Sequence, residues 1–324
     1  MGYPRARIVD SSTAGFYHCI SRCVRRAFLC GDKYDHRRMW IEQRLAELLE
    51  VFTIEACGYT IMSNHLHLVL KTDPRAARAL TDLEVARRWI LLYPADLQRR
   101  IQAADSPAHA RRIETAYLQS IVADHRKITR WRTRLASISW FNKMLKEPIA
   151  RRANREDDCT GHFWEGRFKS IRLLDKAAVL ACMVYIDLNP MRAGMARSLQ
   201  DCSFTSILHR LKVLRRPEGR RRKKAKRTRN TRVRLTLIPI NTLFGFSASQ
   251  YVSLVGATGG VPTDQRDHRA TLTEMGIDAD IWADTIGRTI DWIGTAVGRT
   301  RDLLNEARRR DVQRVVSAID IYLE

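Results

Sequence analysis

The stretch at residues 64–70, Asn-His-Leu-His-Leu-Val-Leu, constrains the fold more than any other part of the chain. It follows a serine-asparagine turn signal and reads as one β-strand. Because side chains on a strand point alternately to opposite faces, the three leucines form an apolar face while His65 and His67 share the other. Their Cα atoms are then about 7 Å apart, so both imidazoles can bind one divalent cation if further groups complete its coordination. The alternative is two unrelated polar residues on a half-exposed strand.

A second informative stretch is Tyr-Ile-Asp-Leu-Asn-Pro at residues 185–190. Apolar residues recur there at helical spacing, Asp175 is suited to cap the helix, and Pro190 is expected to end it. Tyr185 and Asn189 are four residues apart and therefore share a helix face. An amide oxygen can be a third metal ligand, and a phenol can attack a metal-bound phosphate. The alternatives are a core tyrosine and an ordinary Asn-Pro helix end.

Three blocks of sequence together resemble a known family, the REP-associated tyrosine transposases of the HUH (histidine-hydrophobe-histidine) single-strand transposase superfamily. The blocks are Asn-His-Leu-His-Leu at 64–68, Gly-His-Phe-Trp-Glu-Gly-Arg-Phe-Lys-Ser at 161–170, and Tyr-Ile-Asp-Leu-Asn-Pro-Met-Arg-Ala-Gly at 185–194. The resemblance covers about residues 10–210. It implies that His65 and His67 are metal ligands, that Asn189 is a further ligand, and that Tyr185 is the nucleophile.

The resemblance also implies a reaction. One Mg²⁺ or Mn²⁺ would bind a non-bridging oxygen of the scissile phosphate and offset the charge of the transition state. Attack by Tyr185 would leave a 5′-phosphotyrosine bond and a free 3′-OH, so strand transfer needs no external energy source. The ordinary pKa of a phenol is about 10, so a nearby cation is needed to favour the phenolate. The implied substrate is a single-stranded DNA hairpin, such as a repetitive extragenic palindrome, bound by a monomer or a homodimer.

Two other functions fit many of the same residues. A noncatalytic nucleic-acid-binding regulator would need basic and aromatic residues but neither Tyr185 nor the histidine pair; because all of these are present, the enzyme is favoured. A metal-dependent nuclease that uses water would cleave DNA without a covalent adduct. Tyr93 and Tyr117 are rival nucleophiles, but neither is followed four residues later by Asn or Gln.

Charge and cysteine content narrow the class of partner. The 324 residues include 57 Lys and Arg against 35 Asp and Glu, a net charge of +22, which favours a polyanion such as nucleic acid. No run of 18 apolar residues and no apolar signal core is present, so we expect a cytoplasmic, nucleoid-associated protein without a membrane partner. The seven cysteines form no Cys-x-x-Cys pair, which argues against a zinc ribbon and a secreted disulfide framework.

The order of expected elements predicts a ferredoxin-like α+β fold, a split βαβ antiparallel sheet with covering helices. The expected strands are 16–22, 52–62, 64–70 and 167–173. The expected helices are 35–51, 139–152 with its last turn broken or bent at Pro148, and one after Asp175. The catalytic domain would span 1–210, with a helical insertion at about 74–140 built from helices 83–92, 95–104 and 108–136. Residues 211–234 read as a basic, disordered linker, and 235–324 as a helical accessory domain of unknown role.

Residues expected to bind nucleic acid fall in three places. The block at 163–169 interleaves rings that can stack on bases with cations that can meet phosphates, although a core strand with exposed charges fits it equally well. Arginines just upstream favour binding, and the basic linker should grip phosphates in a salt-dependent manner. The full set is Arg152, Arg155, Phe163, Trp164, Arg167, Phe168, Lys169, Arg192, Arg221, Arg222, Lys223 and Lys224.

Overall fold

A five-stranded sheet with the order β2-β3-β1-β4-β5 forms the centre of the molecule. The computed structural model describes residues 8–215, 233–261, 265–287, 295–312 and 315. The strands are β1 (Gly15–Arg22), β2 (Ile54–Ile61), β3 (His65–Thr72), β4 (Lys169–Leu173) and β5 (Ala296–Val297). The pairs β2/β3, β3/β1 and β1/β4 are antiparallel, whereas β5 adds to β4 in parallel. The first four strands have the expected ferredoxin-like topology.

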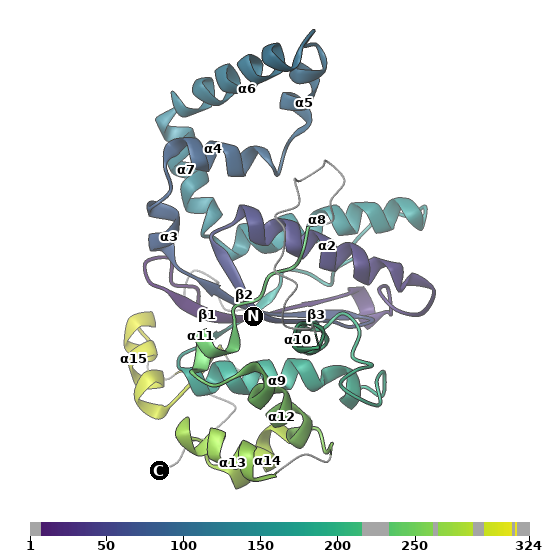
Figure 1. The fold of residues 1–324 in the computed structure, drawn as a ribbon, viewed down its shortest axis with the longest axis vertical. Helices are drawn as coiled ribbons and strands as arrows, with labels where there is room; N and C mark the ends of the chain where they lie inside the picture. The colour runs from purple at the N-terminus through teal and green to yellow at the C-terminus, as the bar shows by residue number, and fades with distance from the viewer. Residues whose placement is uncertain (1–7, 216–232, 262–264, 288–294, 313–314, 316–324) are drawn as a thin grey trace.

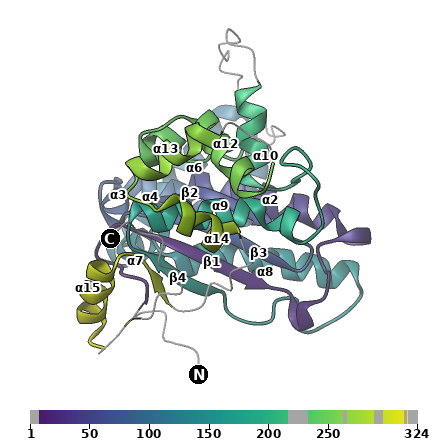
Figure 2. The ribbon, with the colours of Figure 1, turned by 90° about the horizontal axis from the view of Figure 1, so that it is seen from below.

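Helices cover both faces of this sheet (Figure 1). They are η1 (Val24–Arg26), η2 (Asp32–Tyr34), α2 (His36–Val51), α3 (Pro74–Arg78), α4 (Asp82–Ile90), α5 (Ala95–Gln102), α6 (Pro107–Val122), α7 (His125–Leu135), α8 (Ile138–Glu156), α9 (Lys176–Arg192), α10 (Ser206–Leu214), α11 (Ile240–Phe244), α12 (Ala248–Thr258), α13 (Gln265–Glu274), α14 (Ala279–Gly287) and α15 (Thr300–Arg310). The helices α2 and α8 lie on one face and α9 on the other. Figures 1 and 2 show α12, α13 and α14 beyond α9, on the side away from the sheet.

The alternation predicted for β3 is confirmed. Leu66, Leu68 and Leu70 are buried in the core cluster that the sheet forms with α2 and α8. Val69, on the other face, belongs to the cluster that contains the buried side chains of α9. His67 shares that second face by the period of two, so the histidine pair faces α9. Burial of the leucines therefore fixes the register that presents both imidazoles to one helix.

Two prolines lie inside helices, although Pro190 was expected to end its helix and Pro148 to break or bend the last turn of its own. Pro148 is inside α8, which continues to Glu156, and Pro190 is inside α9, which continues to Arg192. A proline leaves the carbonyl four residues earlier without its helical hydrogen bond. Each freed carbonyl has a partner from outside the helix: Arg44 Nε donates to the Met144 oxygen at 3.2 Å, and Thr60 Oγ1 donates to the Ile186 oxygen at 2.6 Å. Tertiary hydrogen bonds thus replace the bonds that the prolines remove.

The helical insertion is α3 to α7, and most of it projects from the sheet (Figure 1). One helix was expected at 108–136, but two are present, because Asp124 caps a new start by accepting a hydrogen bond from Lys127 N at 2.9 Å. Trp89 of α4 stacks on Trp131 of α7 at 5.4 Å between ring centroids. This stacking helps to hold the insertion together as a packed unit.

The segment after residue 234 packs on the part of the chain that precedes it. The expected boundary at 210/211 falls inside α10, and the buried side chains of α12 and α14 share one core cluster with α9. The strand β5 extends the central sheet, so the described part of 235–324 is not purely helical. The disorder expected for the linker, and the residues Arg221, Arg222, Lys223 and Lys224, lie outside the described residues at 216–232.

The Thr60 hydrogen bond can be tested together with Pro190, the residue that leaves its acceptor without a helical partner. Thr60→Val leaves the buried Ile186 carbonyl without a partner, and we expect the free energy of unfolding to fall by about 1–3 kcal/mol in urea denaturation. Pro190→Ala supplies a backbone N–H for the same carbonyl, so Thr60→Val should cost less in that background. An equal loss in both backgrounds would show that the hydroxyl does not replace the helical bond.

Candidate active site

The structure brings three of the expected site residues together. The rings of His65 and His67 lie 4.7 Å apart, and the ring of Tyr185 lies 5.9 Å from that of His67, all measured between centroids. His18 of β1, which sequence analysis did not assign to the site, stacks on His67 at 5.0 Å and lies 6.4 Å from Tyr185. Tyr185 is half-buried and His67 is buried. The candidate site is therefore a cluster of rings between the sheet and α9, with a phenol beside a histidine pair.

Several hydrogen bonds fix how α9 sits over the sheet. Asp175 caps its first turn by accepting from Ala178 N at 2.8 Å, as expected. Farther along the helix, buried Asp187 accepts hydrogen bonds from Ser206 Oγ at 2.6 Å and Tyr251 Oη at 2.7 Å. Burial raises the pKa of Asp187 to about 6, against the opposing effect of these hydrogen bonds and of Arg210. This network was missed by sequence analysis, because nothing in the local pattern distinguishes Asp187 from an exposed helix residue.

The electrostatics keep the histidines neutral. Burial and, next, Arg22 lower the pKa of His65 to about 4. Burial, His65 and His18 hold the pKa of His67 well below its ordinary value. Burial and Lys169 lower the pKa of His18 to about 3. Neutral imidazoles are the form that binds metal, so the charge state suits a cation site.

The donor set fits one divalent cation. Two of the expected ligands each have a buried polar atom without a hydrogen-bond partner: Nε2 of His67 and the side-chain nitrogen of Asn189, one turn beyond Tyr185 on α9. Amide nitrogen and oxygen are exchangeable in assignment, so the same position can present an oxygen ligand. Ring nitrogen with amide oxygen is a combination that Mn²⁺ and Mg²⁺ accept. Among the described residues no group of three or more His, Cys, Asp or Glu could hold a metal, so a cation here would depend on Asn189 or on substrate oxygens.

Arg192 supplies a cation beside the phenol. Its guanidinium carbon lies 5.5 Å from the Tyr185 ring centroid, and one guanidinium nitrogen donates to the Ile286 carbonyl of α14. Burial lowers the pKa of Arg192, with Tyr185 acting in the opposite direction. Arg192, expected to contact DNA, is thus half-buried next to Tyr185, and the segment after 234 positions it.

Lys169 lies on the same sheet face as the histidines. It pairs with Ile20 across β4 and β1, and Ile20 pairs with His67 across β1 and β3. The backbone of exposed Lys169 is therefore two strands from that of His67, about 10 Å at the usual strand spacing. This position suits a contact to a phosphate near the site.

The three rings of the same block are core residues. Phe163, Trp164 and Phe168 are 3%, 7% and 5% exposed, and Trp164 Nε1 donates to the Lys146 carbonyl at 3.0 Å. The expectation that they stack on bases is therefore wrong for this structure, because packing against the α2/α8 side of the sheet covers them. Their basic neighbours are exposed, as expected for phosphate contacts: Arg152, Arg155 and Arg167.

An exposed aromatic residue that sequence analysis missed lies in the loop that contacts Asn64, the residue before His65. Phe28 is 61% exposed in the loop after β1, next to Arg25 and Arg26. Both arginines have left-handed backbone angles, φ 53° and 55°, an uncommon conformation that concentrates at functional sites. Asn64, immediately before His65, donates to the Arg26 carbonyl at 3.1 Å. The sequence signal is the run Arg-Arg-Ala-Phe shortly after a strand.

The rival tyrosines lie in the insertion. The Tyr93 ring is 52% exposed and its hydroxyl is 3.3 Å from Met144 Sδ, while Arg100 lies over the Tyr117 ring at 5.1 Å. Within the described residues, neither ring contacts a histidine of the candidate site. Of the cysteines, Cys159 is exposed and the other six are buried.

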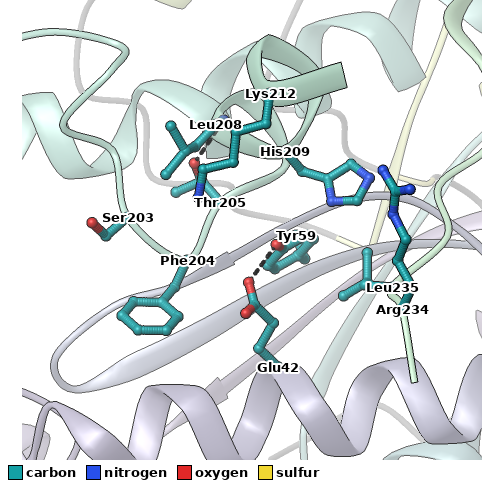
Figure 3. Close-up of a pocket in the computed structure, with 10 residues that line it drawn as sticks. All are labelled: Glu42, Tyr59, Ser203, Phe204, Thr205, Leu208, His209, Lys212, Arg234 and Leu235. Atoms are coloured by element: carbon teal, nitrogen blue, oxygen red, sulfur yellow. Dashed lines mark hydrogen bonds between the residues drawn. The ribbon is translucent and has the colours of Figure 1, made fainter. Parts of the chain in front are cut away.

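A separate pocket of about 330 Å³ lies at the outer edge of β2 (Figure 3). Residues from α2, β2, α10 and the chain around 234 meet there, and Tyr59 Oη donates to Glu42 at 2.7 Å. His209, Lys212 and Arg234 give it a basic lining. Neither the histidine pair nor Tyr185 lines it.

Comparison with known proteins gives little beyond this geometry. No family model and no curated protein matches the chain. A solved structure of a REP-associated tyrosine transposase bound to a REP hairpin covers 67% of this chain and 89% of its own, with 12% identity and a TM-score of 0.35. A likeness of this size does not decide function, which must rest on the site. No helix of the described residues has the length and apolarity needed to cross a membrane.

The buried rings give a test of the corrected assignment. Trp164→Ala should lower the free energy of unfolding by about 3–5 kcal/mol, because it empties a large core volume. Arg167→Ala, three residues on and exposed, should change it by less than about 0.5 kcal/mol. Urea denaturation measures both free energies. Similarly small effects of the two substitutions would contradict the assignment of Trp164 to the core.

Proposed function

We propose that the chain is a metal-dependent single-stranded DNA endonuclease and strand transferase that acts on hairpin DNA through a 5′-phosphotyrosine intermediate. The observation that carries the proposal is the Tyr185 ring, 5.9 Å from that of His67 and on the same side of the sheet as His65. A hydroxyl nucleophile beside two neutral imidazoles suits attack at a metal-bound phosphate.

The site residues have separate roles in the proposed reaction. His65, His67 and Asn189 would hold Mg²⁺ or Mn²⁺, which when bound supplies Lewis-acid stabilisation of charge on the scissile phosphate. The Tyr185 oxygen attacks phosphorus, so a new phenolic O–P bond forms and the bond from phosphorus to the 3′-oxygen breaks. The phenolic proton passes to solvent, and the 3′-oxygen takes up a proton to leave as a hydroxyl. Arg192 lies beside the ring where negative charge develops.

The surface around the site suits a single strand. Exposed Arg22 pairs with His65 across β1 and β3. Exposed Lys169 lies on the same face of the sheet, on β4. Phe28 with its two neighbouring arginines offers a stacking ring beside phosphate-binding cations. The net charge of +22 agrees with a polyanionic substrate.

The decisive experiment looks for a covalent adduct. Purified protein is incubated with Mn²⁺ or Mg²⁺ and labelled single-stranded hairpins from the flanks of its own gene, then run on a denaturing gel. We expect a shifted band that persists under denaturation, is lost in Tyr185→Phe, and is retained in Tyr93→Phe as the matched control. Cleavage without an adduct that survives Tyr185→Phe would indicate a nuclease that uses water. Binding without cleavage, for several hairpins and both metals, would indicate a regulator.

The stacking role of Phe28 has its own test. Phe28→Ala should weaken binding of single-stranded hairpins by about 1–3 kcal/mol, because one base loses its ring partner, while the melting temperature stays unchanged. Met39→Ala, which also removes an exposed apolar side chain, is the control. Fluorescence anisotropy at fixed salt measures both affinities, and equal losses would rule out specific stacking.

A further inference from the structure

Both histidines of the pair use the same ring nitrogen for a hydrogen bond. His65 Nδ1 lies 2.6 Å from Asn64 Oδ1, and His67 Nδ1 lies 2.8 Å from His18 Nε2. In each ring this leaves Nε2 for another partner. Nε2 of His67 is buried and makes no hydrogen bond in the described structure.

The Asn64 contacts determine where the His65 proton is. Asn64 Nδ2 donates to the Arg26 carbonyl at 3.1 Å. A carbonyl can only accept, so the amide nitrogen must face Arg26 and the amide oxygen must face His65. That oxygen also can only accept, so His65 Nδ1 carries the ring proton. A neutral imidazole has one ring proton, and Nε2 of His65 therefore keeps its lone pair.

The contact between His18 and His67 has two possible proton arrangements. If His18 Nε2 donates, the proton of His67 sits on Nε2 and that atom cannot bind a cation. If His18 Nε2 accepts, His67 carries its proton on Nδ1 and Nε2 is a lone-pair donor. Only the second arrangement makes His67 equivalent to His65.

We infer that Asn64 and His18 are positioning residues that hold both histidines in the Nδ1–H tautomer and so present two Nε2 atoms to one divalent cation. Hydrogen bonds to the remote ring nitrogen orient imidazole ligands and raise their basicity. The inference rests on the proposed function for its cation. It assigns a role to β1 and to the loop that holds the Arg26 carbonyl, neither of which supplies a ligand.

The first test reads the tautomers in the metal-free full-length protein. Long-range ¹H–¹⁵N correlation spectra of protein labelled at histidine show which ring nitrogen is protonated, with peaks assigned from His65→Gln and His67→Gln. We expect both rings to be protonated at Nδ1 and unprotonated at Nε2. Protonation of His65 at Nε2 overturns the role inferred for Asn64, and protonation of His67 at Nε2 overturns the role inferred for His18. Both conclusions hold whether or not the protein binds metal.

The second test measures Mn²⁺ affinity from the electron paramagnetic resonance signal of free Mn²⁺. His18→Leu and Asn64→Leu remove the acceptors, and we expect each to raise the dissociation constant about 10–100-fold. His18→Gln keeps an acceptor at a similar position and should recover most of the affinity. Val69→Ala, which pairs with His18 across the strands, controls for loss of packing. Equal weakening in all four variants would overturn the inference in favour of a structural role.

Failure of the proposed function gives a different pattern. Wild-type protein that binds Mn²⁺ normally but forms no tyrosine adduct contradicts the transferase and leaves the positioning role supported. Wild-type protein that binds no Mn²⁺ overturns the cation on which the inference rests, whatever the tautomers are.

Discussion

The hydrogen bond from Thr60 to the Ile186 carbonyl connects the two halves of the site. Pro190 frees that carbonyl, and Thr60 lies opposite His67 in the β2/β3 pair. The bond therefore joins α9, which carries Tyr185, to the residue of β2 that pairs with His67. One residue further along α9, Asp187 is hydrogen-bonded to Ser206 of α10 and Tyr251 of α12. Together these contacts set both the height and the rotation of α9 over the sheet.

Much of this arrangement could be predicted because it is encoded locally. The alternation of residues 64–70 determines the two faces of β3, and the spacing of Tyr185 and Asn189 places them on one helix face. The order of strands and helices was enough for the ferredoxin-like topology. These features depend on periodicity, which survives in a single sequence without tertiary information.

The features that escaped prediction depend on partners distant in sequence. A proline breaks a helix unless another group donates the hydrogen bond that its missing N–H would have made. In α8 that donor is Arg44, which is about 100 residues from Met144 in the sequence. Aromatic residues beside cations fit a core strand and a stacking surface equally, and only the packing on α2 and α8 shows that Trp164 is core. His18 and Phe28 lie in an N-terminal stretch whose relation to His67 is set by strand pairing.

The helix that bears Tyr185 is covered on both sides, by the sheet and by α12 to α14. This helix is thus buried in a continuous apolar interior, and moving it would expose two apolar layers to water at once. The phenol and the imidazoles also come from one polypeptide. In the proposed reaction the fixed parts are therefore protein and the mobile parts are DNA: between cleavage and rejoining, strand ends must exchange places at a stationary nucleophile.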